Sequence, residues 1–320
     1  SSWDVSNVTD MVSMFNRAVA FNQDLIGWDV SSVTTMFKMF RGAYIFDGDV
    51  SSWDVSSVTD FREMFQDADD FNQNIDGWDT IAALGMDSMF KDAATFNQPL
   101  NSWDVSSVTD MNQMFSGTEI FNQPLNSWVV SSVRNMEGMF RKAIAFNQPL
   151  NGWDVSSVDN MISMFNGANI FDNDINLWDV SSVTDMRSMF IGASSFNQDI
   201  NIWDVSSVSN MDNMFKDTTT FNQPLNNWDT SGVGGMNTTF FNATSFNQDI
   251  SAWDVGNVTD MVDMFNGATS FSVSNYDLLL GGWSTQTVTP NVILGVQSTQ
   301  FSSGAPTTAR GILTSAPNNW

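Results

Sequence analysis

The feature that most constrains this chain is a tryptophan that recurs every 25 residues without insertion or deletion. The recurrence begins at Trp3 and ends at Trp253, and it defines eleven repeats in one register. A fixed period of this length indicates one small structural unit stacked many times, because a single unit cannot bury its own apolar face. The sequence therefore predicts a solenoid.

The apolar composition follows the same period. All 20 Met lie at two positions of the repeat, Met11 and Met14 in the first, and 22 of the 26 Phe lie at the positions of Phe15 and Phe21. Because these positions recur at fixed places, we expect them to form the core, which is aromatic and thioether-rich.

The second half of each repeat has the spacing of a helix. Val33, Met36, Met39, Phe40 and Ala43 follow the i, i+3, i+6/7, i+10 pattern of one helical face. We expect a helix of about eleven residues here.

The first half of each repeat has the spacing of a short strand. Leu25-x-x-Trp28-x-Val30 has the L-x-x-L-x-L shape of a leucine-rich repeat, which predicts that Trp28 and Val30 point inward and Asp29 outward. The predicted fold class is an α/β repeat solenoid, leucine-rich-repeat-like, with a short parallel strand ladder on one face and helices on the other. Residues 1–271 form this solenoid and residues 272–320 a C-terminal cap.

Residue 1 lies inside a repeat, two residues before Trp3. A solenoid end exposes its core unless it is capped, and we recognise no N-terminal cap in the sequence. We therefore expect the chain to be a fragment of a longer chain, with more repeats or another domain before it.

The average repeat, W-D-V-S-S-V-T-D-M-x-x-M-F followed by F-N-Q-x-L, resembles the BspA-like leucine-rich-repeat surface proteins over residues 1 to about 271. The stretch from Asn275 through Trp283 also resembles the cap that closes such arrays. The resemblance implies an extracellular, often surface-anchored protein that serves adhesion or partner recognition. The fourth repeat, around residues 80–85, and the tenth, around residues 232–241, depart from the pattern.

Charge and missing residue types exclude several functions. The chain has no Cys and no His, so zinc–thiolate sites, thiol nucleophiles and His general bases are excluded. With 36 acidic and 11 basic residues, we expect no nucleic-acid partner, because phosphate binding depends on Lys and Arg. No apolar run reaches the ~18 residues of a membrane helix, so we expect no membrane span in this segment.

An aspartate follows the recurring Trp in ten of the eleven repeats, and Val129 takes its place in the other. We call this set the aspartate row: Asp4, Asp29, Asp54, Asp79, Asp104, Asp154, Asp179, Asp204, Asp229 and Asp254.

Stacked carboxylates repel one another, and three interpretations stay open. In the first, each Asp accepts hydrogen bonds from the backbone N–H and the Ser hydroxyl two residues on. In the second, the row shares Ca²⁺ ions between repeats. In the third, two neighbouring carboxylates form the catalytic pair of a glycosidase. The last is disfavoured because identical residues on an open face would not have split pKa values. Apart from Ca²⁺, we expect no cofactor.

A second column is amide-rich. We interpret it as an internal structural ladder that satisfies turn backbone groups in successive coils. Its members are Asn22, Asn72, Asn97, Asn122, Asn147, Asn197, Asn222 and Asn247, with Asp47 and Asp172 as substitutes.

Two further columns have ordinary explanations. The basic residues fall in the predicted helices, where a solvated surface explains them and a docking patch near Arg134, Arg141 and Lys142 is the alternative. A threonine column that includes Thr9 and Thr34 is too interrupted for an ice-binding lattice.

Together these observations predict a non-enzymatic, extracellular recognition or adhesion protein. It would bind a protein or glycan partner at a cell surface through many weak contacts along its acidic face, with the aspartate row in contact and with Val129 and the fourth repeat as specificity points. The alternative is a rigid spacer or cell-surface filament segment, stabilised by calcium through the aspartate row.

Overall fold

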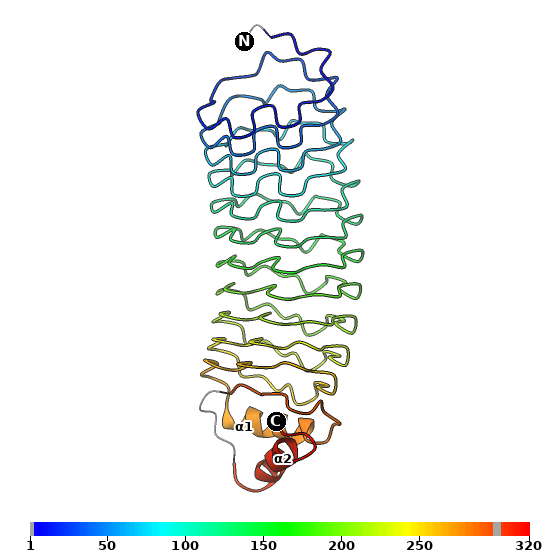
Figure 1. Cartoon of the computed structure of the whole chain (residues 1–320), viewed down its shortest axis with the longest axis vertical. Coiled ribbons are helices and arrows are strands. Elements are labelled where there is room, and N and C mark those ends of the chain that lie inside the picture. The colour runs from blue at the N-terminus through cyan, green and yellow to red at the C-terminus, as the bar shows by residue number, and fades with distance from the viewer. Residues whose placement is uncertain (1–2, 297–301) are drawn as a thin grey trace. The chain divides into compact units, whose positions relative to one another are not determined.

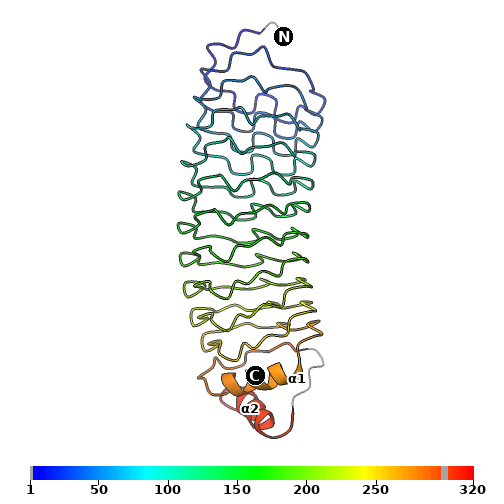
Figure 2. The ribbon, with the colours of Figure 1, turned by 180° about the vertical axis from the view of Figure 1, so that it is seen from behind.

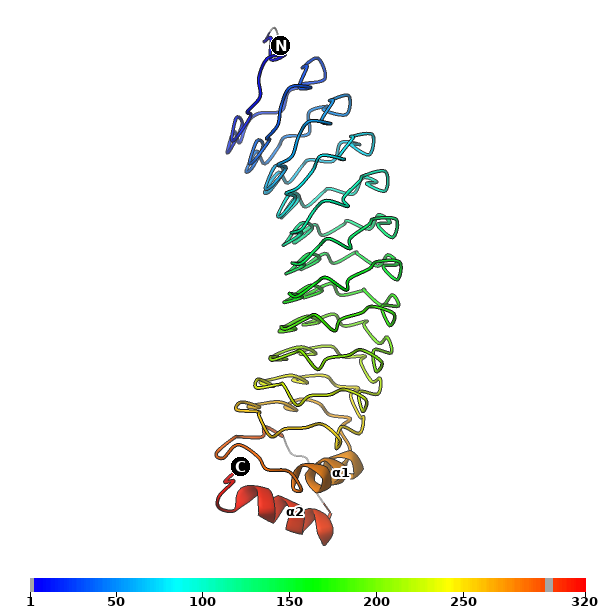
Figure 3. The ribbon, with the colours of Figure 1, turned by 90° about the vertical axis from the view of Figure 1, so that its right-hand side faces the viewer.

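The computed structural model describes residues 3–296 and 302–320. The chain divides into two compact units, Ser1–Val158 with Gly167–Phe171 (the first unit) and Asp159–Asn166 with Asp172–Trp320 (the second unit). Within each unit, a 25-residue repeat forms one turn of chain, here called a coil, and successive coils stack in sequence order (Figure 1). The same coils, turned by 90°, are seen edge-on in Figure 3.

The predicted α/β class is wrong. The helices found in the described part of the chain are α1 (Val273–Trp283) and α2 (Ala305–Thr314), and both follow the repeats. Neighbouring coils share isolated parallel bridges of one residue each, such as Thr35 with Asp60, and no extended strand. The described coils therefore contain neither the strand ladder nor the helix layer of a leucine-rich repeat, as the view from behind also shows (Figure 2).

The stretch predicted as a helix forms two tight turns. In the second coil these turns span residues 36–39 and 40–43, and in both the last N–H donates to the first carbonyl at 3.0 Å. Their third residues, Lys38 and Gly42, have φ of 59° and 68°. A type II turn requires this left-handed conformation at its third residue, and a helix excludes it. Both positions are left-handed in all eleven repeats.

The helical spacing arose because each turn begins and ends on a buried residue. The two ends are three residues apart, and a helix also places residues i and i+3 on one face. One feature of the sequence argued for turns and against a helix: the second left-handed position is glycine in five repeats. These are Gly42, Gly117, Gly167, Gly192 and Gly267.

Alternate N–H groups in these turns donate to the next coil. The pairs are Met36 to Asp60, Lys38 to Arg62, Phe40 to Met64 and Gly42 to Gln66, with N···O distances of 2.8–3.0 Å. Each coil thus satisfies its backbone partly within its own turns and partly through its neighbour, as buried backbone groups require.

Aromatic columns fill the interior. Phe40 and Phe65 stack with ring centroids 5.6 Å apart, and Phe40 also stacks on Phe46 at 4.0 Å. The indole of Trp53 is buried and donates from Nε1 to the carbonyl of Leu25, 3.0 Å away. The prediction that the Met and Phe columns form the core is confirmed, since these side chains are buried in the coils that follow the first.

The C-terminal segment satisfies the backbone of the last coil. Ser272 is the N-cap of α1, and its hydroxyl accepts from the N–H of Asn275. Gln286 accepts from the N–H of Val255 and donates to the carbonyl of Trp253, both at 2.8 Å. Within the described ranges, no helix has the length and apolar character needed to cross a membrane.

We expect Gly42→Val to destabilise the protein by about 1–2 kcal/mol, because a φ of 68° is strained for a β-branched residue. Gly42→Asn should cost less, since Asn tolerates this conformation. Chemical denaturation followed by Trp fluorescence measures both. The control is Gly27→Val, whose Cβ meets nothing within 4 Å and whose φ lies outside the left-handed range. Equal losses in the two Val variants would contradict the explanation.

Candidate functional site

The aspartate row lies on the outside of each unit because its neighbours in sequence point inward. In the second coil, Trp28 and Val30 are 6% and 1% exposed, while Asp29 between them is exposed. The predicted directions of these three side chains are confirmed. Every coil except the one with Val129 thus carries one carboxylate of the row, in the first unit from Asp4 to Asp154 and in the second from Asp179 to Asp254.

A local hydrogen-bonded turn fixes each carboxylate. Asp29 Oδ1 accepts from the N–H of Ser31 at 3.1 Å and from its hydroxyl at 2.6 Å. The same pair of bonds holds Asp4, Asp54, Asp104, Asp154, Asp179 and Asp204. The backbone bond alone recurs at Asp79 and Asp254, where Ile81 and Gly256 replace the serine.

These hydrogen bonds outweigh the repulsion along the row. The hydroxyl of Ser31 lowers the pKa of Asp29 most, its N–H lowers it further, and the charges of Asp54 and Asp4 raise it by less. Serine hydrogen bonds likewise lower the pKa values of Asp4, Asp54, Asp104, Asp154 and Asp229. These six carboxylates are therefore ionised at neutral pH, and the bonds from serine hold them in place without a cation.

The row is interrupted in the first unit by an apolar residue. Val129 is 57% exposed, and a hollow of about 320 Å³ lies beside it, lined also by Trp103, Asp104 and Ser106. A ligand in this hollow would contact the methyl groups of Val129 and, beside them, the carboxylate of Asp104, which Ser106 holds in place.

The row does not assemble a metal cage. Among residues 3–296 and 302–320, no three acidic side chains group closely enough to hold a metal ion. Calcium takes six to eight oxygen ligands, whereas each coil offers one carboxylate with Oδ1 already engaged by serine or backbone. The geometry therefore does not favour calcium in the row, and the calcium hypothesis stays a prediction.

The amide column forms a chain of hydrogen bonds between coils. Asn97 Oδ1 accepts from the N–H of Asn122 at 3.0 Å, and Asn122 Oδ1 accepts from the N–H of Asn147 at 2.9 Å. The same bond runs from Asp47 to Asn22, from Asn72 to Asp47, from Asn97 to Asn72, from Asn197 to Asp172, from Asn222 to Asn197 and from Asn247 to Asn222.

The glutamine that follows strengthens this column. Gln123 donates from Nε2 to the carbonyl and to the Oδ1 of Asn97, both at 3.0 Å. In the second unit Asn275 of α1 makes the same two bonds to Asn247, so the helix takes the place that another coil would occupy. In the coil-to-coil bond the side chain of the column acts only as an acceptor, through its Oδ1. An Asp carboxylate offers the same acceptor, which explains why Asp can replace Asn at positions 47 and 172.

The basic residues of the coils lie in the two-turn stretch, except Arg134, which comes just before it. Lys38 and Arg41 both pair with Glu63, at 3.4 and 2.9 Å, and Arg62 pairs with Asp60 at 2.7 Å. The expectation that they occupy helices is wrong, since these coils form turns.

A hollow at the fourth coil was missed in the sequence. It measures about 390 Å³ and is lined by Asp60, Arg62, Gly85, Asp87 and Asp110, among others. Burial and the charge of Asp110 raise the pKa of Asp87. The signal in the sequence was Gly85, which stands where the adjoining repeats carry Asp and where a Cβ would meet the Arg62 side chain at 3.0 Å.

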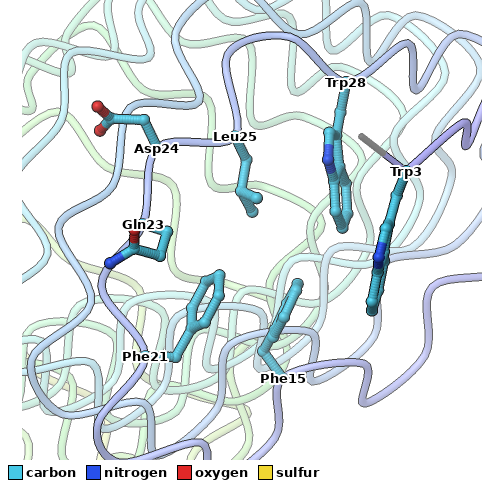
Figure 4. A pocket seen from close by; sticks show the side chains of 7 residues that line it. All are labelled: Trp3, Phe15, Phe21, Gln23, Asp24, Leu25 and Trp28. Atoms are coloured by element: carbon cyan, nitrogen blue, oxygen red, sulfur yellow. The ribbon is translucent and has the colours of Figure 1, made fainter. Parts of the chain in front are cut away.

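Another hollow, of about 250 Å³, opens inside the first coil. Figure 4 shows Phe15, Phe21 and Leu25 around it, with Trp3 and Trp28 side by side along one edge. These are the core positions that later coils bury, so we assign this hollow no ligand.

The family model described as "Mycoplasma protein of unknown function, DUF285" matches residues 1–98, 74–176 and 167–278. These overlapping matches confirm a repeat protein, but they do not name the BspA-like family. No curated protein matches the chain significantly. A solved structure titled "Crystal structure of TLR13-ssRNA13 complex" is similar at 9% identity and a TM-score of 0.16, over 79% of this chain and 44% of that chain. This chain thus spans less than half of that one, and so weak a likeness carries no argument.

We expect Asn97→Leu to destabilise the protein by about 1–3 kcal/mol, because the N–H of Asn122 and the amide of Gln123 lose their acceptor. Asn97→Asp keeps the acceptor and should cost little. Thermal and denaturant unfolding of the two variants measures the difference, and similar losses in both would contradict an acceptor role.

We expect Ser106→Ala to raise the pKa of Asp104 toward its ordinary value of 3.8, because the largest lowering cause is removed. Since the folded pKa is lowered, Asp104 contributes stability that is present above pH 3.8 and is lost as the pH falls through the folded value. The variant should reduce that acid-dependent loss. Carbon-13 NMR titration of the carboxyl group measures the shift, with Ser107→Ala as the control that should leave it unchanged.

Proposed function

We propose a function from one premise: the chain belongs to the family described as Mycoplasma protein of unknown function, DUF285. In our proposal it is an extracellular, surface-located recognition protein without enzymatic activity. It binds a cationic protein or glycan partner through the aspartate row. The likeness of its repeat sequence to BspA-like surface proteins supports the location and the adhesive role, while the leucine-rich-repeat architecture is not carried over.

The observation that carries this proposal is the fixed orientation of the carboxylates. The two bonds from serine hold Asp54, Asp104 and Asp154 in the same way, at 2.6 Å from the hydroxyl and 2.9–3.1 Å from the N–H. A partner that binds an ordered row does not lose the entropy of immobilising those side chains. Contacts that are weak singly then add along the coils of each unit.

The direction of the pKa shifts supports a binding role over catalysis. A glycosidase needs one carboxyl with a raised pKa beside one that stays ionised. Every shift resolved in the row is a lowering, by the same serine bonds. All these groups are therefore in the same charge state at neutral pH, as a charged surface requires.

A rigid spacer is the second candidate. It is favoured by the coil-to-coil bonds of the amide column and by the stacked aromatic core, which hold adjacent coils at fixed separations. Both candidates use the same rigidity, so a binding measurement separates them.

We expect a fluorescein-labelled octalysine peptide to bind the protein, with an affinity that falls as salt rises from 50 to 200 mM. Asp54→Asn with Asp104→Asn should weaken binding by about threefold or more, since exposed charge pairs contribute 0.2–1 kcal/mol each. Fluorescence anisotropy measures the affinity. The charge-matched control is Asp24→Asn with Asp76→Asn, which lie outside the row. Equal loss in both double variants would show nonspecific charge attraction, and no binding would favour the spacer.

A further inference from the structure

A second surface of the first unit carries exposed apolar side chains in one column. Each coil makes a turn of two residues at the surface just before its second Phe, at residues 19 and 20 in the first coil. In the first unit this turn places six large apolar side chains in solvent, each 41–53% exposed: Val19, Tyr44, Ile45, Ile120, Ile144 and Ile170. Single exposed apolar residues are ordinary, but a column of them marks an interaction site. We call this column of turns the turn ridge.

Backbone hydrogen bonds connect the turns of the ridge. The N–H of Asp70 donates to the carbonyl of Tyr44 at 3.0 Å, and the N–H of Thr95 donates to the carbonyl of Asp69 at 3.1 Å. The N–H of Ala145 donates in the same way to Glu119 at 3.0 Å. The ridge is therefore a stacked and ordered surface.

The centre of the ridge is acidic. Asp69 and Asp70 occupy the turn of the third coil, between the turn of the second coil, which carries Tyr44 and Ile45, and that of the fifth, where Ile120 follows Glu119. Within the described residues, neither carboxylate has a hydrogen-bond donor or an ion pair. Burial and the charges of Asp67, Asp70 and Asp92 raise the pKa of Asp69, so this group gains from a cation beside it.

The second unit shows that the fold does not need this chemistry. The same turns carry only hydroxyl residues there: Ser194, Ser195, Thr219, Thr220, Thr244, Ser245, Thr269 and Ser270. Thr220 and Thr244 use their hydroxyls to bond the carbonyl of the preceding turn. Large apolar side chains in the first unit are therefore an addition to a turn that folds without them.

We propose that the turn ridge is a docking surface for a partner protein, in the form of an extended segment with apolar side chains on both sides of a basic centre. Charge complementarity selects the occupant, because only basic side chains offset the carboxylates of Asp69 and Asp70. Ridge-to-ridge pairing of two copies is disfavoured, since it would bring these like charges together. The proposal uses no residue of the aspartate row and does not depend on it.

The coil spacing sets the pattern of the partner. Ile45 and Ile120 belong to the second and fifth coils, three coil steps apart. The Phe rings that directly follow these turns stand 5.9–6.0 Å apart from coil to coil, so three steps span about 18 Å. An extended chain advances about 3.3 Å per residue and turns every second side chain to the same face, so apolar side chains six residues apart match the two isoleucines. The side chains two and four positions after the first apolar residue lie on that face and meet Asp69 and Asp70, so these two residues should be Lys or Arg.

The test uses the whole chain and a fluorescein-labelled peptide, Gly-Leu-Ser-Lys-Ser-Lys-Ser-Leu-Gly amide, in anisotropy titrations. Ile45→Ser with Ile120→Ser should weaken binding on the order of tenfold or more, because half-exposed side chains lose their apolar contact. Asp69→Asn with Asp70→Asn should weaken it by about threefold or more. Serine stands at the matching turn positions of the second unit, so these variants should fold, which circular dichroism checks.

Two matched variants serve as controls and should change the affinity less than twofold: Ile26→Ser with Ile81→Ser for apolar exposure, and Asp24→Asn with Asp76→Asn for charge.

Two altered peptides test the wild-type chain without any mutation, one with Ser for both Leu and one with Gln for all Lys, and both should bind more weakly. The proposal is overturned if the unaltered peptide does not bind, if the Leu-to-Ser peptide binds equally well, or if Asp54→Asn with Asp104→Asn causes the larger loss. The last outcome would leave the aspartate row as the binding surface.

Discussion

Backbone hydrogen bonds between residues one repeat apart are the constraint on which the rest of this structure depends. The N–H groups of alternate residues in each two-turn stretch find their acceptors in the next coil, as Lys38 does in Arg62. An inserted residue would lengthen the chain between every donor and acceptor that lie on either side of it, and would leave those buried polar groups unpaired. This requirement gives a physical reason for the strict 25-residue period, and it explains how coils without extended strands or helices hold together.

The same constraint converts a position in the repeat into a column on the surface. A buried position becomes a stack of rings, such as Phe90, Phe115 and Phe140, with centroids 5.7–5.8 Å apart. An exposed position becomes a row of identical or varied groups. The aspartate row and the turn ridge are two such columns, and they differ in kind. The aspartate row repeats one charged group. The turn ridge is apolar on both sides of an acidic centre in the first unit and carries hydroxyl residues in the second.

Much of the site could be foreseen because its geometry is local. An aspartate followed two residues later by serine closes a hydrogen-bonded turn whatever lies around it, so Asp104 and Ser106 could be paired from the sequence. The outward direction of Asp29 followed from its place between Trp28 and Val30. The hollow at Gly85 could not be foreseen, because its walls come from three coils and depend on where Arg62 lies. The turn ridge was missed for the same reason: Ile45 and Ile120 are 75 positions apart in sequence and join one surface only when the coils stack.

The sequence by itself determined the repeat length, the number of repeats, the identity of the core columns and the positions that face solvent. All of these follow from periodicity, which is a property of the chain alone. The tertiary structure decided the conformation between the core positions. A spacing of three residues fits both a helical face and a tight turn that begins and ends in the core, and local propensity does not separate the two when Lys38 or Glu63 occupies a left-handed position. The chain forms turns here because turns leave alternate N–H groups free to donate to the next coil, whereas a helix would use those groups for its own hydrogen bonds.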